Sequence, residues 1–323
     1  MRIHQSIRVA ATVIVAAWVL AGGPPVAAEP YPDRPIQLII PFAPGDTDQM
    51  LRPFTERMGE FLGRPVVLNY KPGAAGGLGA GMVATSKPDG YTLVGSSPGS
   101  LVIVPLANKE MKYGTDSFAP IAALVEGGLM LVVPAGSPYQ SIKDVVEQAK
   151  RAPGTITFSS SGVMGITHLL AEIFSQAAGI KLNHIPHQGS GPAITALLGG
   201  HVDMASTAIA PAQGHIQAGK LRALAAFSDK RLKAYPDVPT LKEMGYDVGS
   251  PTLYGIVAPR GTPDDVIAAL HGAARKVSEK YGDQIGASLS LIGAEVKLLG
   301  PREYADYLDN QARLFGRGIR SLN

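Results

Sequence analysis

Short apolar, β-branched runs that alternate with helical patterns constrain the fold of this 323-residue chain more than any other feature. The first unit is a buried-strand run at residues 36–42, a Pro-Gly break, and apolar residues at helical spacing from Leu51 onward. Similar runs recur at 66–70, 91–95, 121–124, 130–133, 156–158, 184–186, 221–227 and 253–257. Strands separated by helices indicate βαβ units, so the sequence predicts an α/β fold with parallel sheets.

Three of the predicted loops share one design. Residues 41–48, 159–168 and 187–192 each follow a strand, contain glycine with hydroxyl or small residues, and open a helix. In an open α/β sheet such loops lie beyond the carboxyl ends of the strands, where helix N-termini offer unpaired N–H groups. We therefore predict that three helix N-termini meet around one anion and that the first loop holds a carboxylate. Ordinary βα turns look much the same in sequence, and that interpretation stays open.

The first 28 residues are typical of a secretory signal peptide. Arg2 and Arg8 precede or flank an apolar run at residues 9–21, and small residues follow at 26–28. The run is shorter than the roughly 20 residues that a membrane span requires. The chain has no cysteine, so we expect no disulfide and no lipid anchor, but a soluble protein of an envelope compartment.

The charge and length that remain after residue 28 limit the partners and the domain count. Removal of Arg2 and Arg8 leaves 27 basic against 26 acidic residues, and no basic run suggests nucleic acid as a partner. Roughly 295 residues exceed what one compact core usually supports, so we predict two domains.

Two sequence motifs raise enzymatic alternatives. Residues 95–99 match the G-x-S-x-G nucleophile elbow of serine hydrolases, with Ser97 as the nucleophile. Pro98 argues against this reading, because the oxyanion hole uses the N–H of the residue after the nucleophile and proline has none. A serine hydrolase is therefore the weaker alternative. Gly79, Gly81 and Ala84 match a dinucleotide-binding pattern, but they lie in a glycine-rich tract that we interpret as a loop.

The histidines do not suggest a metal site. His184 and His187 are three residues apart on a predicted strand, which tends to point their side chains to opposite faces. His168 and Glu172 are one helical turn apart, but two ligands do not make a site. We expect no metal and no other cofactor. His168 is either a helix-start residue that donates to a ligand or a packed or solvated histidine, and both interpretations stay open.

Seven ordered blocks carry a family resemblance: YPDRPIQLIIPFAPGDTD, LNYKPGAAGGLGAG, KPDGYTLVGSS, HIPHQGSGPAITALLGGHVDM, GKLRALA, YPDVPTLKEMGYD and YGIVAPRGTP. In this order they resemble the substrate-binding proteins of tripartite tricarboxylate transporters, the Bug family, over essentially all of the chain after residue 28. The resemblance implies a type II periplasmic binding protein, with two α/β domains joined by a two-strand hinge and the ligand in the cleft. It also implies a monomer without catalytic activity that binds a small organic carboxylate and delivers it to a membrane permease.

The resemblance also implies domain boundaries and ligand contacts. Domain 1 would comprise 29–130 plus 254–323 and domain 2 would comprise 131–253, with crossover strands near Leu131 and Tyr254. One ligand carboxylate would be held by backbone groups, hydroxyls and bridging waters of two loops. By position these contacts fall on Phe42, Ala43, Pro44, Gly45, Asp46, Thr47, Asp48, Gly189, Ser190 and Gly191. Further cleft positions that would select the rest of the ligand are Ser97, Ser161, Thr167, His168 and Thr207.

The chain departs from the family pattern at Asp46. The family loop usually reads PFAPGGGTD, whereas PFAPGDTD is one residue shorter and places Asp46 where glycine is expected. A carboxylate there repels a ligand carboxylate unless it is turned away, paired or bound to a cation. We favour the interpretation that Asp46 caps the following helix. The alternative is that Asp46 shifts ligand choice towards an amine-bearing or less charged acid. For the function as a whole, the alternative is a soluble receptor that feeds a sensor or signalling partner.

Overall fold

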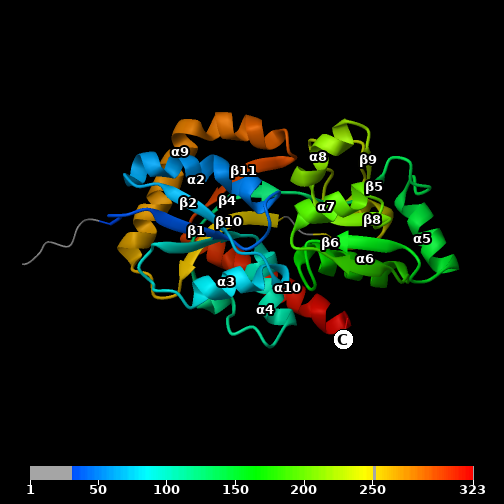
Figure 1. Cartoon of the computed structure of the whole chain (residues 1–323), viewed down its shortest axis with the longest axis horizontal. Helices are drawn as coiled ribbons and strands as arrows, with labels where there is room; N and C mark the ends of the chain where they lie inside the picture. The colour runs from blue at the N-terminus through cyan, green and yellow to red at the C-terminus, as the bar shows by residue number, and fades with distance from the viewer. Residues whose placement is uncertain (1–30, 250–251, 323) are drawn as a thin grey trace, which may run out of the picture. The chain divides into compact units, whose positions relative to one another are not determined.

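The structure, a computed structural model, describes residues 31–249 and 252–322 (Figure 1). The predicted signal peptide at residues 1–28 lies outside the described residues. The described residues from Arg34 onward belong to one compact unit. Within the described ranges, no helix is both long enough and apolar enough to cross a membrane.

The first sheet of the 34–323 unit has six strands in the order β11-β4-β10-β3-β1-β2. Their bounds are β1 Ile36–Ile40, β2 Val66–Tyr70, β3 Thr92–Ser96, β4 Phe118–Gly127, β10 Thr252–Pro259 and β11 Ala294–Leu299. β1 pairs in parallel with β2 and β3, whereas β10 is antiparallel to both β3 and β4. β11 is also antiparallel to β4, so the prediction of parallel sheets is wrong for three of the five strand pairings of this sheet.

The second sheet has five strands in the order β7-β6-β8-β5-β9. Their bounds are β5 Leu129–Pro134, β6 Thr157–Ser160, β7 Asn183–Pro186, β8 Met204–Ala208 and β9 Leu221–Ala226. β6 is parallel to β7 and β8, while β5 is antiparallel to β8 and β9. β8 was not predicted from the sequence, because MASTA is too rich in small and hydroxyl residues to form an apolar run. β11 in the first sheet was not predicted either.

Helices cover both sheets, and each half is built from its own set (Figure 1). Their bounds are α2 Thr47–Leu62, α3 Gly77–Ala84, α4 Val104–Ala107, α5 Ile142–Arg151, α6 Ile166–Ala178, α7 Ser190–Leu198, α8 Ile209–Gln217, α9 Asp264–Ser290 and α10 Pro301–Leu322. A π-helical turn, Gly99–Ile103, follows β3. The fold is thus the predicted α/β arrangement of two sheets with flanking helices.

Local start and stop signals account for several helix ends. The spacing of Ser141 and Asp144 in the sequence predicts a capping box, and α5 begins with one: Ser141 Oγ accepts from Asp144 N and the Asp144 carboxylate accepts from Ser141 N. Gly179 ends α6 in the left-handed conformation, as a glycine at this position commonly does. Thr262 followed by Pro263 and two aspartates predicts a threonine N-cap with proline at the first helical position; instead Pro263 precedes α9, and the Thr262 hydroxyl donates to Pro259 O.

The long C-terminal helix α10 packs against the cores of both sheets. Tyr304 and Leu308 belong to the core that includes Ile39, Val94 and Val257 of the first sheet. Phe315 and Ile319, three turns later, belong to the core that surrounds β5 and β6. α10 therefore connects the two halves through apolar contacts, in addition to the two strand connections.

Candidate functional site

Two of the predicted loops touch each other, one from each sheet. Residues 41–46 connect β1 to α2, and residues 187–189 connect β7 to α7. Ala43 N donates a hydrogen bond to Gln188 O at 3.0 Å. A Cβ atom on Gly191 would lie 2.7 Å from Pro44 O, so only glycine allows the backbones to approach this closely.

A small cavity of about 10 Å³ lies beside this contact, which is about the space of one water molecule. Its walls are Phe42, Asp46, Ser97, Leu129, Ser161, Ile166, Thr167, Ser190 and Tyr254. Asp46 precedes α2, Ile166 and Thr167 begin α6, and Ser190 begins α7. The three loops thus do bring three helix N-termini to one place. The anion that they would bind stays a prediction.

The chemistry of this cavity suits a carboxylate held without a cationic side chain. The first turns of α6 and α7 leave backbone N–H groups without intrahelical partners, and the positive end of each helix dipole lies there. None of the described residues that line the cavity is Lys, Arg or His. The Ser97 hydroxyl has no hydrogen bond to another described residue and can donate to a ligand oxygen.

The remaining predicted site residues do not line the cavity. Ala43, Pro44, Gly45, Gly189 and Gly191 form or flank the contact between the two loops. Four others, Thr47, Asp48, His168 and Thr207, are buried near it.

Two of these buried residues bond within their own half. Asp48 Oδ1 accepts from Gly45 N at 2.8 Å and Asp48 Oδ2 accepts from the Tyr70 hydroxyl at 3.0 Å, which fixes the first loop. The Thr207 hydroxyl donates to Ala208 O within the second half.

Asp46 does not cap α2, so the interpretation that we favoured from the sequence is wrong. It occupies the N-cap position, but its side chain makes no cap hydrogen bond. The Tyr254 hydroxyl donates to the Asp46 carboxylate instead, at 3.0 Å from Oδ2 and 3.2 Å from Oδ1. Asp48 makes the bond that fixes the start of the helix, which leaves Asp46 free to face Tyr254.

The surroundings of Asp46 favour its neutral form. The pKa of Asp46 is raised from 3.8 to about 7, mainly because burial removes water from the carboxylate; the Tyr254 hydrogen bond lowers the pKa and the charge of Asp48 raises it, and both effects are smaller than that of burial. Burial and the charge of Asp46 also raise the pKa of Tyr254 well above 10, so Tyr254 remains a hydrogen-bond donor.

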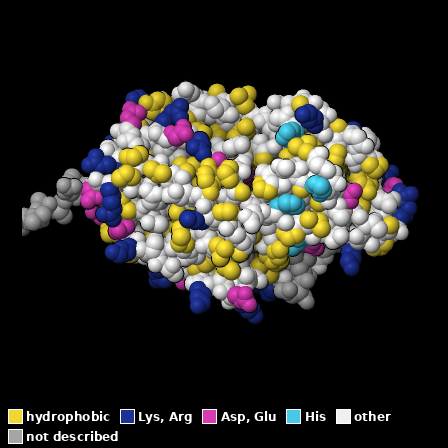
Figure 2. Space-filling model, viewed as in Figure 1, with side chains coloured by type: hydrophobic (Ala, Val, Ile, Leu, Met, Phe, Trp, Pro, Cys, Tyr) yellow, Lys and Arg dark blue, Asp and Glu magenta, His cyan; other side chains and the backbone are white. Residues whose placement is uncertain are grey.

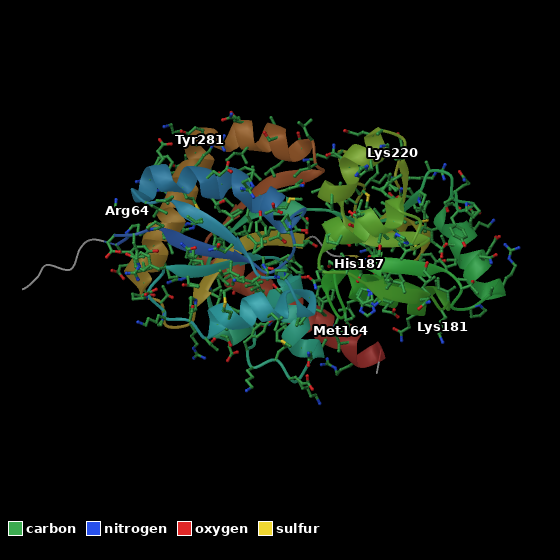
Figure 3. All side chains as sticks on the ribbon, in the orientation of Figure 1. Arg64, Met164, Lys181, His187, Lys220 and Tyr281 are labelled. Carbon is green, nitrogen blue, oxygen red and sulfur yellow. The ribbon has the colours of Figure 1, made fainter. Side chains whose placement is uncertain are left out.

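His168 is a packed histidine in this structure. Its Nδ1 accepts from Met164 N at 3.0 Å, and its ring stacks on His184 with 3.8 Å between ring centroids. His184 Nε2 lies 2.6 Å from Ser160 Oγ. Burial, then the charge of His168, lowers the pKa of His184 to about 4. Figure 3 labels Met164 and His187, which lie in the loops before α6 and α7.

The motifs that raised enzymatic alternatives have other surroundings. Ser97 has no hydrogen bond to a histidine among the described residues, and Pro98 leads into the π-helical turn. Gly79, Gly81 and Ala84 lie inside α3, so their interpretation as a loop is wrong. The described part of the chain holds no group of three or more His, Cys, Asp or Glu side chains that could bind a metal.

Three cavity residues were not predicted from the sequence: Leu129, Ile166 and Tyr254. Tyr254 lies in β10, some 200 residues after Asp46, and is almost completely buried. The sequence predicted that Tyr254 lies beside the strand connection between the two domains. The direction of its side chain depends on the register of β10, which the sequence does not give, so the position of its hydroxyl at the cavity was not predictable.

A larger cavity, of about 740 Å³, lies where the chain passes from β4 to β5. Its walls come from residues 126–128, 227–234 and 286–296, and include none of the predicted site residues. On the face shown in Figure 2, basic and acidic side chains are interspersed rather than gathered into one basic surface. The smaller cavity is the candidate site because helix N-termini and hydroxyl groups meet there.

The family comparisons agree with one another. A family model described as "Tripartite tricarboxylate transporter family receptor" matches residues 50–323. A Cupriavidus necator protein described as "UPF0065 protein in gbd 5'region" is 35% identical over 309 residues, which cover 95% of this chain and 93% of that protein. Protein BugT of Bordetella pertussis is 37% identical over 252 residues, covering 76% of this chain and 77% of BugT.

Solved structures resemble the fold closely. One described as "Structure of a periplasmic transporter" has a TM-score of 0.86 and 33% identity, and covers 91% of this chain and 99% of its own. MatC from Rhodopseudomonas palustris with bound malate has a TM-score of 0.85, 26% identity, and coverage of 90% and 100%. Another R. palustris protein, with adipate, has a TM-score of 0.84, 26% identity, and coverage of 90% and 98%.

Proposed function

Because the chain belongs to the tripartite tricarboxylate transporter receptor family, we propose that it captures a small organic carboxylate and delivers it to a membrane permease of that transporter type. The family is one of solute-binding receptors rather than enzymes. The proposed ligand site is the cavity between the loops that precede α2, α6 and α7. The proposed contacts are Phe42, Asp46, Ser97, Ser161, Thr167, Ser190 and Tyr254, together with the first-turn N–H groups of α6 and α7.

One observation carries this proposal: three helix N-termini and a free Ser97 hydroxyl meet at a cavity whose walls contain no Lys, Arg or His among the described residues. Helix N-termini bind anions through converging N–H groups and the positive end of the dipole. The malate-bound and adipate-bound relatives support a carboxylate as the anion.

The proposal includes opening and closing of two domains, 29–130 with 254–323 and 131–253. A cavity of about 10 Å³ is too small for an organic acid, so the 41–46 and 187–191 loops must separate before a ligand enters. Closure around the ligand then excludes water and strengthens each hydrogen bond. The permease would recognise the closed form. We further propose that residues 1–28 direct the chain to the periplasm, where it acts as a monomer.

Thermal unfolding with a ligand panel tests the binding function. The purified protein, unfolded and refolded to remove bound ligand, is heated with aliphatic, amino and aromatic carboxylates and with neutral analogues as controls. A ligand at 100 times its dissociation constant adds about 2.7 kcal/mol of stability, which shifts the unfolding midpoint visibly. A shift with one class of acid supports the proposal, and no shift with any carboxylate contradicts it.

Deletion of the gene tests the delivery step. We expect uptake of the identified acid to stop in the deletion strain and to return with the wild-type gene. Unchanged uptake, with loss of a transcriptional response to the same acid, would instead favour a receptor that feeds a signalling partner.

A further inference from the structure

Asp46 is a carboxylate at the cavity wall without a charged partner. It forms no ion pair with any described residue, and its one hydrogen-bond donor is the Tyr254 hydroxyl. That hydroxyl supplies a single proton, whereas a carboxylate has about four acceptor sites. Most of the hydrogen-bonding capacity of Asp46 is therefore unused on the side of the cavity.

The described residues at the start of α2 supply neither a further hydrogen-bond donor nor a positive charge to the Asp46 carboxylate. Asp46 makes no cap hydrogen bond, and the adjacent Thr47 hydroxyl is buried without a hydrogen-bond partner among the described residues. Asp48, the nearest other charge, is also negative and is engaged by Gly45 N, Tyr70 and Arg52. A partly buried carboxylate with one donor among the described residues is unfavourable unless a further donor or a cation arrives.

We propose that the ligand carries an ammonium group that pairs with Asp46, while its carboxylate binds at the N-termini of α6 and α7. This inference rests on the proposed function and narrows its ligand class to small zwitterions, of which α-amino acids are the simplest. An ammonium supplies three N–H donors and the positive charge that the cavity wall lacks. The carboxylate of the same ligand meets the helix N-termini on the wall formed by Thr167 and Ser190.

An opposing arrangement uses the same residues in another protonation state. A neutral Asp46 could donate its proton to the carboxylate of a ligand that has no amine. The two arrangements predict opposite proton movements. The groups that face Asp46 are Asp48 from α2 and Tyr254 from β10, and burial with these neighbours sets its pKa at about 7. An ammonium ligand stabilises the ionised form and expels the proton, whereas an amine-free acid takes up a proton.

Titration calorimetry with matched ligand pairs tests the inference. Each pair is an amino acid and the acid of the same carbon chain without the amine, such as aspartate with succinate and alanine with propionate. At pH 8 we expect the amino member of the best pair to bind at least about 30-fold more tightly. At pH 7, two buffers of different ionisation enthalpy should reveal release of about half a proton per ligand.

Asp46→Asn removes the charge and keeps the shape of the side chain. It should abolish the preference for the amino member and the proton release, and Asp46→Gly should do the same if the substituted asparagine disturbs the loop. Asp116→Asn is the matched control, since it removes an exposed carboxylate paired with Arg260 away from the cavity. It should leave both quantities unchanged.

The outcomes separate this inference from the proposed function. Equal or tighter binding of the amine-free member by the wild type, proton uptake, or an unchanged ranking in Asp46→Asn would overturn the inference while leaving a carboxylate receptor. Binding of neither member of any pair, and of no other carboxylate, would overturn both.

Discussion

Replacement of Asp46 by asparagine should stabilise the ligand-free protein, and the gain should depend on pH. The pKa of Asp46 is about 7 in the folded protein and 3.8 without the fold, so the folded state binds the proton more tightly. Between these values the folded chain holds more protons than the unfolded chain, and the unfolding free energy contributed by Asp46 falls as pH rises. A shift of about three pKa units corresponds to about 4 kcal/mol.

The expected gain is smaller than this upper figure because Asp46 keeps part of its surface at the cavity, where water can screen its charge. We expect the stability difference between Asp46→Asn and wild type to grow by about 2 to 4 kcal/mol from pH 4 to pH 8. Urea unfolding at half-unit pH steps measures this difference. His184, whose pKa of about 4 gives a pH dependence of the opposite sign, is present in both proteins and cancels.

The assay requires ligand-free protein, since an ammonium ligand would lower the pKa of Asp46 and hide the effect. Asp116→Asn again serves as the control for loss of a surface carboxylate. A stability difference that is the same at pH 4 and pH 8 would refute the reasoning, because it would mean that Asp46 ionises in the fold as it does in the unfolded chain.

Two further predictions concern the loop contact and the histidine stack. Gly191→Ala should weaken ligand binding by about tenfold or more, because its Cβ would lie 2.7 Å from Pro44 O and overpacking costs about 1 to 3 kcal/mol. Calorimetry should show no such loss of affinity for the control Gly214→Ala, whose Cβ meets nothing within 4 Å. Equal affinity in both variants would contradict the role of the loop contact. His184→Asn should flatten the dependence of unfolding free energy on pH between pH 4 and 6.5. Because the pKa of His184 is about 4 in the folded protein and 6.5 in the unfolded chain, its protonation lowers the unfolding free energy by up to about 3 kcal/mol as pH falls over this range. If urea unfolding gives the variant and the wild type parallel profiles, this prediction is wrong.

The sequence predicted the α/β class and most strands because these depend on local apolar runs. β2 was predicted at its observed bounds, and β1, β3 and β5 within one or two residues, since each is a β-branched run between turn residues. β8 was not predicted because a fully buried strand of small residues shows no alternation of apolar and polar residues. The antiparallel direction of β10 was not predicted either, because it depends on how the chain passes between the sheets and on no local sequence signal.

The candidate site was predictable to the extent that it is made of loops between a strand and a helix. Phe42, Ser97, Thr167 and Ser190 reach the cavity because, in each of the two sheets, the loops after parallel strands gather at the carboxyl ends of those strands. Tyr254 could not be found in this way, since it comes from a strand interior and its hydroxyl reaches the cavity only through the register of β10. The role of His168 was also undecidable, because His168 lies in α6 and its stacking partner His184 lies in the following strand, β7.

Two helices, α5 and α2, have an acidic residue at their start, and the comparison of the two starts bears on function. Ser141 and Asp144 carry a capping signal and form the capping box that the signal predicts. Asp46 carries an equally good signal and forms no cap, although a cap typically contributes about 1 kcal/mol. The protein thus forgoes a local stabilisation and also holds a desolvated carboxylate against the start of a helix. Local rules that fail in this way mark functional positions, because the stability given up in the free protein is recovered when a ligand supplies the missing donor. If the ligand carries the proposed ammonium group, the unfavourable state of free Asp46 would make the site select that ligand over an acid without an amine.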